Sequence, residues 1–502
     1  PNIIIIMDNS GSMSNRACES TACGVLSNGS TSTTTTWTNT TRYSGYFDPM
    51  RCYVYDTTDT RFENGTAKTA LDTACPNTEW DGNFLNWATF RRFDAVKRSM
   101  NGGDCFVARA ADGTCPANGT PALKTVRAQA TGTSTERADV NYGGGTGANT
   151  YVGRIPSADR TGNPGTISIH TDAAYFCVED DTSFNNNCND SYSVRKYELK
   201  IGYTTEPTGV IQQIGPKARF GLMEFKSSSQ GARMLVGVGA RQSIDWSGSG
   251  VETFTTNTTA RYVAQINSTY DPSNYVYPIA FAGGVSNGTN FATNGVGSIG
   301  TSEISALGGG ESCPSGYIAS ACGRDPYFFG SNHTPPWAST SQVVNCCRTF
   351  VIIFTDGEPT QDQNVPAAIQ DFGHTHHGVH CNGSDAGAPP RPINGTCNTN
   401  AATPFSDLLA EHKTDYADSG SHFLDDVAYW AHTTDLRPCN GSADGTIPQL
   451  AVTGHCLSGT QNLTVYTFFA FGNINGRGIL AQTARLGAFD DSNNDGIPQT
   501  NE

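Results

Sequence analysis

Two short apolar runs, each followed by an aspartate, place the strongest constraint on the fold. Residues 2–7 (Asn-Ile-Ile-Ile-Ile-Met) precede Asp8, and residues 349–355 (Thr-Phe-Val-Ile-Ile-Phe-Thr) precede Asp356. Neither run alternates apolar with polar residues, which is typical of strands buried on both faces in a parallel sheet. Residues 83–100 show the three-to-four spacing of apolar residues that predicts a helix. Buried strands that alternate with helices predict an open α/β sheet.

Long segments between these elements show no periodicity. The chain has 502 residues, of which 15% are charged and 55 are glycine, and these segments are rich in Thr, Ser, Asn and Gly. Such composition is typical of turns and loops. We therefore expect large loop insertions, without cores of their own, at residues 16–80, 102–196 and 360–405.

Sixteen cysteines indicate an oxidising compartment, because cytosolic thiols stay reduced and are usually sparse. No CxxC…CxxC zinc pattern explains them. Short spacings favour local disulfides, although spacing alone does not determine connectivity. The favoured pairs are Cys18–Cys23, Cys52–Cys75, Cys105–Cys115, Cys177–Cys188, Cys313–Cys322, Cys381–Cys397 and Cys439–Cys456. Adjacent Cys346 and Cys347 remain, and they form either a vicinal bridge or a cross-link between lobes.

The charge pattern excludes nucleic acid as a partner. The net charge is −15, with 31 basic and 46 acidic residues, and no cluster of Lys or Arg appears in the sequence. A protein that follows a phosphate backbone needs a basic surface. The longest apolar runs, residues 3–7 and 350–354, are far below the ~20 residues that cross a bilayer, so we expect no direct membrane span. Because the chain starts at Pro1 without a charged and apolar leader, we expect that a signal segment was removed or that the chain begins inside a longer protein.

An Asp-x-Ser-x-Ser pattern directly follows the first apolar run, with Asp8, Ser10 and Ser12 at its defined positions. Ligands of open α/β sheets bind at the carboxyl ends of the strands, where the loops separate. A carboxylate and two hydroxyls from one tight turn provide an oxygen-only set, which suits Mg²⁺, Mn²⁺ or Ca²⁺ rather than zinc. The alternative is a polar turn that only ends a strand.

The two strands that each end in an aspartate, one of them with the Asp-x-Ser-x-Ser pattern, resemble the von Willebrand factor A domain with its metal-ion-dependent adhesion site. The resemblance implies a Rossmann-like, open, mainly parallel sheet over residues 1–489, interrupted by the insertions above. It also implies Mg²⁺, or Mn²⁺ or Ca²⁺, held by Asp8, Ser10, Ser12, Asp356 and a threonine from another loop. Thr301 opens a predicted helix before the later strand and is favoured over Thr289.

Several segments spread over nearly the whole chain resemble the PilY-type family, the tip-associated adhesin and biogenesis factor of bacterial type IV pili. They are residues 83–103, 206–225, 350–362, 423–438 and 461–472. The resemblance implies a protein secreted through the periplasm that adheres to a host or abiotic surface at the pilus tip, with minor pilins as partners. The alternative is a structural or mechanosensing cap that primes pilus assembly, in which the metal only holds the fold. The family usually continues into a C-terminal β-propeller, whose functions are not carried over to this chain.

Residues 490–502 are similar to the calcium loop of an EF-hand. Positions 1, 3, 5, 6 and 12 of such a loop are Asp491, Asn493, Asp495, Gly496 and Glu502. Oxygen ligands at alternate positions converge on one Ca²⁺, and the glycine allows the sharp turn. We expect a calcium-binding linker toward a following domain. The alternative is a solvated acidic tail, since Pro498 interrupts the loop and no exit helix follows it.

Two further chemical roles, a transition-metal site and a hydrolase nucleophile, are not favoured by the sequence. The histidine cluster of His374, His376, His377 and His380 has enough imidazoles for a transition metal, but it lies in a Gly/Pro-rich insertion, which favours a polar loop. Ser10 and Ser12 are not in a GxSxG elbow, and the sequence places no histidine to activate either hydroxyl. We therefore expect no enzyme.

Overall fold

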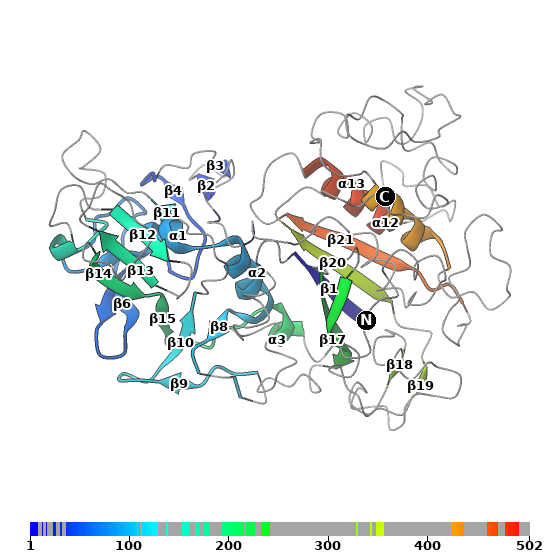
Figure 1. Cartoon of the computed structure of the whole chain (residues 1–502), viewed down its shortest axis with the longest axis horizontal. Helices are drawn as coiled ribbons and strands as arrows, with labels where there is room; N and C mark the ends of the chain where they lie inside the picture. The colour runs from blue at the N-terminus through cyan, green and yellow to red at the C-terminus, as the bar shows by residue number, and fades with distance from the viewer. Residues whose placement is uncertain are drawn as a thin grey trace.

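The computed structural model shows two bodies that lie side by side (Figure 1). One is built around a five-stranded sheet and the other around a seven-stranded sheet. We call them the parallel lobe and the aromatic lobe. The structure describes residues 1–8, 13, 17, 24–26, 31–32, 37–107, 109–110, 113–128, 137–138, 153–159, 166–170, 175–179, 193–214, 217–225, 232–240, 328–329, 342–343, 348–355, 423–435, 459–469 and 477–490.

The sheet of the parallel lobe joins strands that are far apart in the sequence. Its order is β17 (Ala232–Ala240), β16 (Arg219–Phe225), β1 (Asn2–Met7), β20 (Thr349–Thr355) and β21 (Leu463–Phe469). β1 lies between β16 and β20 and is parallel to both, and β20 is parallel to β21. β17 is antiparallel to β16. The mixed α/β class that the sequence predicts is therefore confirmed.

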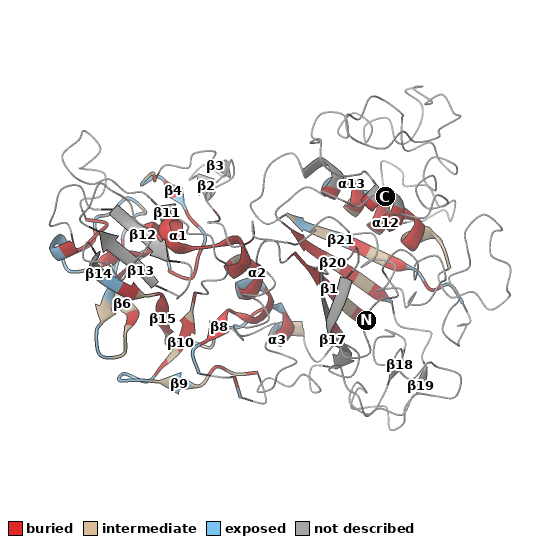
Figure 2. Cartoon of the chain, viewed as in Figure 1, coloured by how far each residue is buried: buried red, intermediate tan, exposed pale blue. Residues whose placement is uncertain are grey.

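Helices cover both faces of this sheet, which explains the unbroken apolar run of β1. Side chains on the Ile5 face pack against α2 (Arg92–Asn101) and α3 (Val210–Ile214). On the opposite face, α12 (Phe423–Thr433) and α13 (Arg477–Ala488) contact β21. As a result β1 lies in the buried centre of the lobe (Figure 2), and Ile4, Ile5 and Ile6 have 0% exposure.

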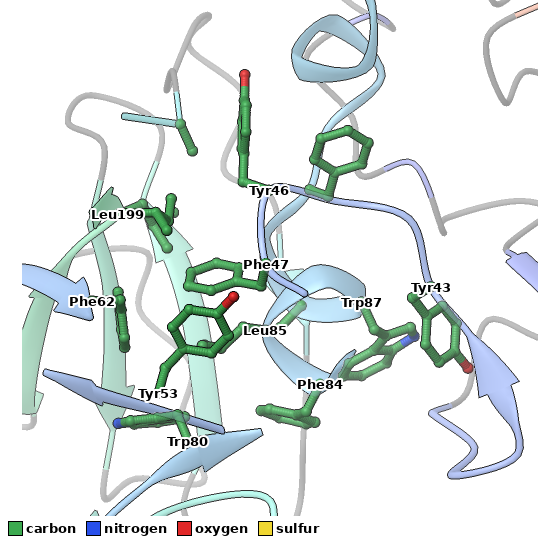
Figure 3. Packing of buried hydrophobic residues seen from close by; sticks show 14 of the residues in the cluster. Tyr43, Tyr46, Phe47, Tyr53, Phe62, Trp80, Phe84, Leu85, Trp87 and Leu199 are labelled. Carbon is green, nitrogen blue, oxygen red and sulfur yellow. The ribbon is translucent and has the colours of Figure 1, made fainter. Parts of the chain in front are cut away.

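The aromatic lobe contains a core that the sequence analysis did not predict. Its sheet has the order β7 (Trp80–Asp81), β5 (Arg51–Asp56), β6 (Arg61–Ala67), β15 (Lys200–Tyr203), β10 (Leu123–Arg127) and β8 (Asp104–Cys105), with β9 (Ala117–Asn118) also paired to β10. Figure 3 shows aromatic rings such as Phe62, Trp80 and Trp87 packed between this sheet and α1 (Gly82–Thr89). The expectation that residues 16–80 and 102–196 are loops without a core is therefore wrong for their described part. The aromatic residues of this core come from strands of two to seven residues, from the short helix α1 and from the segment of residues 37–47, and elements that short carry no readable periodicity.

The remaining described elements are short. β3 (Thr31–Ser32), β2 (Gly24–Leu26) and β4 (Thr41–Arg42) form a three-stranded sheet. β11 (Arg137–Ala138), β12 (Thr166–His170), β13 (Tyr175–Glu179) and β14 (Ser193–Glu198) form a four-stranded antiparallel sheet. β18 (Phe328–Phe329) pairs with β19 (Gln342–Val343), and residues Ser157–Asp159 form a 3₁₀ turn.

The helix predicted over residues 83–100 is two helices, and the break between them lets each helix pack against a different core. Phe90 is extended, so α1 ends before it and α2 begins at Arg92. Apolar residues of α1 belong to the aromatic core, whereas Phe93, Val96 and Met100 of α2 pack on the five-stranded sheet. The predicted stop is confirmed, because Gly102 caps α2 with a φ of 85° that favours glycine. α1 and α2 therefore link the two lobes through adjacent cores.

Candidate functional site

Asp8 lies directly after β1 at the carboxyl edge of the five-stranded sheet. Its side chain is buried, with 1% of the residue exposed. Its backbone N–H donates to the carbonyl oxygen of Phe354 at 2.8 Å, which extends the pairing of β1 with β20 by one residue. Its Oδ2 accepts a hydrogen bond from Oγ1 of Thr355 at 2.8 Å. The carboxylate is thus held in a defined orientation at the end of two adjacent parallel strands.

The strand register explains why these residues meet. Met7 is paired with Phe354 in parallel register, so the next residue of each chain segment, Asp8 and Thr355, reaches the same edge. Asp356 follows Thr355 in the sequence. Carboxyl ends of parallel strands are where ligands bind in open α/β sheets. The chain therefore brings its first aspartate to a position where α/β proteins usually bind ligands.

The other predicted adhesion-site residues lie outside the described residues. These are Ser10, Ser12, Thr301 and its rival Thr289, and Asp356. The predicted set therefore stays a prediction, except that Asp8 is placed at the expected edge. Thr355 is a new member of this edge, and the sequence contained a signal for it, because a hydroxyl residue precedes the aspartate that follows the second apolar run.

The chemistry of this edge fits a hard divalent cation. Asp8 contributes a buried carboxylate, and one of its oxygens accepts a hydrogen bond from the hydroxyl of Thr355. Oxygen ligands of this kind suit Mg²⁺, Mn²⁺ or Ca²⁺. A hydrogen bond from a neighbouring hydroxyl orients a ligating carboxylate, which is the usual role of residues around a metal site. Asp8 could hold the metal directly, with Thr355 as the residue that positions it.

The calcium loop and the histidine cluster also lie outside the described residues, which are continuous only to residue 490 at that end of the chain. Neither prediction is therefore tested. The sites assigned to Asp491, Asn493, Asp495 and Glu502 stay predictions, as does the interpretation of His374–His380 as a polar loop.

Two of the expected disulfides are present in the structure. Cys52 is bonded to Cys75, and Cys105 is bonded to Cys115. All four residues are buried in the aromatic lobe. Each of the other expected pairs includes at least one cysteine that lies outside the described residues, so these pairs stay predictions. These two bonds are consistent with the oxidising compartment inferred from the cysteine content.

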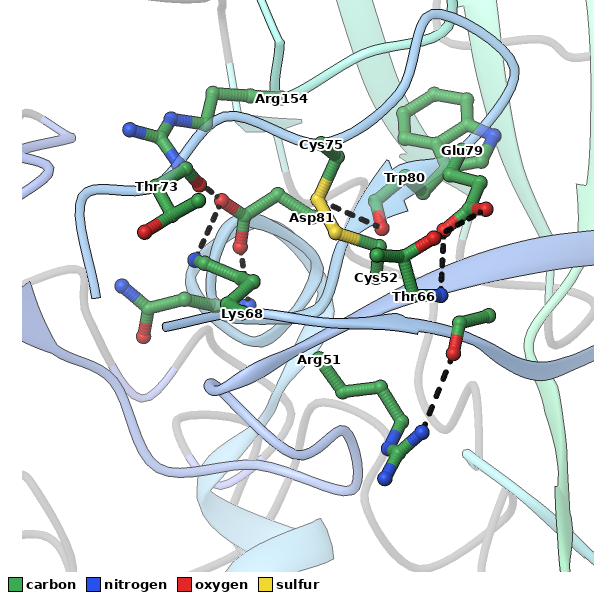
Figure 4. Close-up of a disulfide and its surroundings, with 12 residues drawn as sticks. Arg51, Cys52, Thr66, Lys68, Thr73, Cys75, Glu79, Trp80, Asp81 and Arg154 are labelled. Atoms are coloured by element: carbon green, nitrogen blue, oxygen red, sulfur yellow. Dashed lines mark hydrogen bonds and ion pairs between the residues drawn. A yellow bond between two sulfur atoms is a disulfide. The ribbon is translucent and has the colours of Figure 1, made fainter. Parts of the chain in front are cut away.

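A buried ion cluster lies beside the Cys52–Cys75 bond (Figure 4). Asp81 Oδ2 is 2.9 Å from Nζ of Lys68 and 2.5 Å from Nη1 of Arg154. The other oxygen of Asp81 accepts the N–H groups of Asn83 and Phe84 and so caps α1. A buried carboxylate that satisfies two cations and a helix end has a structural role, because each of these groups is costly to leave unpaired. We assign no ligand to it.

The aromatic lobe also contains a cavity of about 730 Å³ that the sequence analysis missed. Its lining includes Arg42, Arg51 and Arg98, which come from β4, β5 and α2. Positions 42, 51 and 98 form no basic run in the sequence, so no charge pattern indicated a shared site. The fold alone brings them together.

Comparison with known proteins gave a match for part of the aromatic lobe. Residues 34–141 match the family model described as PilY1 homolog, small alpha/beta domain. The matched range includes α1, α2, β5, β6 and β10, but not β1 or Asp8. Comparisons with the curated proteins and with the solved structures gave no match. Within the described part of the chain, none of the helices has the length and apolar character needed to cross a membrane.

Proposed function

We propose that the chain is a PilY1-type protein of type IV pili, as the match of residues 34–141 to that family's domain supports, and that it is a pilus-tip adhesin that binds its ligand through a divalent cation. In this proposal the parallel lobe is a von Willebrand A-type domain. The strand order, the three parallel strand pairs and the helices on both faces support that assignment.

The observation that carries the proposal is the position of Asp8. It is the first residue of an Asp-x-Ser-x-Ser pattern, it is buried, and it lies at the carboxyl edge of the sheet beside Thr355. Asp8, Ser10, Ser12, Thr301 and Asp356 would hold the cation, which is Mg²⁺ or else Mn²⁺ or Ca²⁺. The cation, when bound, attracts a carboxylate of the surface ligand as an additional oxygen ligand.

The hydroxyl ligands matter for this mechanism. Ser10, Ser12 and Thr301 would orient the cation without neutralising it, whereas Asp8 and Asp356 provide the negative charge. A cation with few anionic ligands stays attractive to an incoming carboxylate. We propose no catalytic role for any of these residues.

Adhesion of beads coated with the purified chain tests this function. We expect beads to adhere to epithelial monolayers or to glass in Mg²⁺ and to detach in EDTA, while circular dichroism shows that the fold persists. Adhesion that is equal in Mg²⁺ and in EDTA would contradict the metal-dependent mechanism.

A second candidate is a structural or mechanosensing cap that binds minor pilins and primes pilus assembly. One observation favours the cap: the family model matches part of the aromatic lobe and does not include β1 or Asp8. In this case the metal would only hold the fold. Capture of purified minor pilins by metal-free protein, with no loss in EDTA, would support the cap, and metal-dependent capture would favour the adhesin.

For residues 490–502 we propose a calcium-binding loop. Three carboxylates, from Asp491, Asp495 and Glu502, would repel one another without a cation. Calcium accepts six to eight oxygens at roughly 2.3–2.6 Å, whereas Mg²⁺ demands a tight octahedron, so the loop should prefer calcium. Calcium titration of the wild type and of the Asp491→Ala, Asp495→Ala double variant tests this. Equal uptake by the two proteins would show that the segment is a solvated tail.

A further inference from the structure

The arginine cavity, as we call the 730 Å³ cavity of the aromatic lobe, is lined by five parts of the chain. These are residues 42–49, Arg51 and Tyr53 of β5, Asn64 of β6, Arg98 of α2 and residues 203–205. Its volume lies within the range of about 300–1,000 Å³ that is typical of small-molecule sites.

Three guanidinium groups line this cavity without a carboxylate partner. Arg98 donates to the carbonyl oxygen of Gly45, and Nη1 of Arg51 donates to the carbonyl oxygen of Gly65 at 3.2 Å. The side chain of Arg42 has no hydrogen bond to another described residue, and none of the three guanidinium groups forms an ion pair with a described carboxylate. Each guanidinium has five N–H donors, so most of these donors remain available for a ligand. In a chain with a net charge of −15, this is a local concentration of positive charge.

The wall of the cavity is held rigidly by side chains of α1. Nδ2 of Asn86 donates to the carbonyl oxygens of Tyr43 and Phe47 at 3.1 and 2.8 Å, and its Oδ1 accepts the N–H of Phe47 at 2.9 Å. Nδ2 of Asn83 donates to the carbonyl oxygen of Thr41, and Oδ1 of Asn83 accepts the N–H of Tyr43, both at 2.8 Å. These bonds fix the segment between β4 and β5. A preformed site loses less conformational entropy when a ligand binds.

The remaining polar groups of the cavity suit the hydroxyls of a sugar. Asp48 is the one carboxylate of the described lining, and Asn64, Ser44 and Thr204 add amide and hydroxyl groups. A carboxylate accepts hydrogen bonds, and sugar hydroxyls donate them. A peptide with several acidic side chains offers fewer donors, and its charges would be repelled by Asp48. A ligand that carries a carboxylate together with several hydroxyls satisfies both kinds of group.

We propose that the arginine cavity binds an acidic saccharide, with Arg42, Arg51 and Arg98 on its carboxylate and Asp48 and Asn64 on its hydroxyls. Guanidinium groups pair with carboxylates through two parallel hydrogen bonds, which gives direction as well as charge complementarity. This site lies in a different lobe from Asp8 and uses no metal. It can therefore exist whether or not the metal-dependent adhesion proposed above is correct.

The test is calorimetric titration of the full chain in EDTA with three acidic saccharides: a galacturonate tetrasaccharide, a hyaluronan tetrasaccharide and sialyllactose. Lactose and galactotetraose serve as neutral comparisons, and hexaglutamate serves as the acidic peptide. We expect at least one acidic saccharide to bind about tenfold or more tightly than its neutral counterpart, because hydrogen bonds to charged groups are stronger than neutral ones. Binding should weaken as salt is raised.

Arg42→Gln is the decisive variant, because the side chain of Arg42 makes no hydrogen bond to another described residue and its loss should leave the fold intact. We expect about a tenfold loss of affinity in this variant. Arg348→Gln removes the same charge from an exposed position in the other lobe and should bind like the wild type. The proposal is wrong if no acidic saccharide binds, if Arg42→Gln binds as well as Arg348→Gln, or if hexaglutamate binds more tightly than every saccharide.

Discussion

The hydroxyl of Thr355 donates a hydrogen bond of 2.8 Å to the carboxylate of Asp8, although the two residues are 347 positions apart. Both are buried, with 0% and 1% exposure. The bond joins the ends of β1 and β20 at the edge where we propose the cation. A buried carboxylate that is oriented in this way keeps one geometry before any metal arrives, which lowers the cost of binding.

Thr355→Val should therefore weaken the binding of the cation without abolishing it. Valine has a similar shape but no hydroxyl, so the carboxylate of Asp8 loses a partner that orients it. Loss of such a partner typically reduces metal affinity by about 10- to 100-fold. Titration with Mn²⁺, followed by electron paramagnetic resonance, measures this change.

Thr349→Val is the matched control at the opposite end of the same strand. Its hydroxyl accepts a hydrogen bond of 3.2 Å from Nδ2 of Asn2, so the substitution also removes a side-chain bond between β1 and β20. We expect a similar loss of stability and no change in Mn²⁺ affinity. Equal Mn²⁺ affinities in the two variants would contradict the role assigned to Thr355.

Asn86→Leu should destabilise the aromatic lobe strongly. The buried amide of Asn86 satisfies the carbonyls of Tyr43 and Phe47 and the N–H of Phe47. Its loss leaves buried backbone groups unpaired at about 1–3 kcal/mol each, so we expect a total loss of roughly 3 kcal/mol or more in urea unfolding. Asn462 is exposed and makes one bond to the carbonyl of His432, so Asn462→Leu should cost less than about 1 kcal/mol. Similar losses for the two variants would show that the amide of Asn86 is not a structural clamp.

Removal of the Cys52–Cys75 bond should also destabilise this lobe. The two residues are separated by 23 positions, and closure of a loop of this size contributes about 3 kcal/mol by constraining the unfolded chain. The Cys52→Ala, Cys75→Ala double variant should unfold at lower urea concentration than the wild type. Non-reducing peptide mapping of the wild type checks these two bonds and all the pairs that lie outside the described residues. Mostly free thiols would contradict both the pairing and the extracytoplasmic location.

Stability should rise with pH above about 8 because of Lys97. This residue is buried in α2, and burial lowers the pKa of its ammonium from 10.5 to about 8, although Asp104 and Asp94 act in the opposite direction. In the unfolded chain the pKa returns to about 10.4. Between these values the unfolded state binds more protons, so the free energy of unfolding increases with pH, by up to about 3 kcal/mol.

Thermal unfolding measured from about pH 8 to about pH 10, between the folded and unfolded pKa values of Lys97, tests this effect. Lys97→Met removes the titrating group, and we expect its profile to be flatter than that of the wild type. Above this range burial raises the pKa of Tyr46 and Tyr203, so the folded state holds their protons longer and stability should fall again. An unchanged rise in Lys97→Met would mean that another group causes it.

Sequence reasoning could predict the parts of the fold in which burial leaves a long, unbroken apolar run. The apolar runs of β1 and β20 and the position of Asp8 at the end of β1 could be predicted, because unbroken burial leaves a readable pattern. The break between α1 and α2 could not, since Phe90 and Arg91 carry no stop signal and the break depends on two different cores. The arginine cavity is a product of tertiary structure, because Arg42, Arg51 and Arg98 are separated in sequence and only the fold of the aromatic lobe joins them.

Asp8→Asn tests the central claim most directly. The asparagine keeps an oxygen for the hydroxyl of Thr355 but removes the negative charge, so the fold should persist while the cation loses a main ligand. Mn²⁺ titration should show one site in the wild type that is missing in Asp8→Asn and retained in the Asp491→Ala, Asp495→Ala double variant. Unchanged Mn²⁺ binding in folded Asp8→Asn would contradict the assignment of a metal-dependent adhesion site to this edge of the sheet.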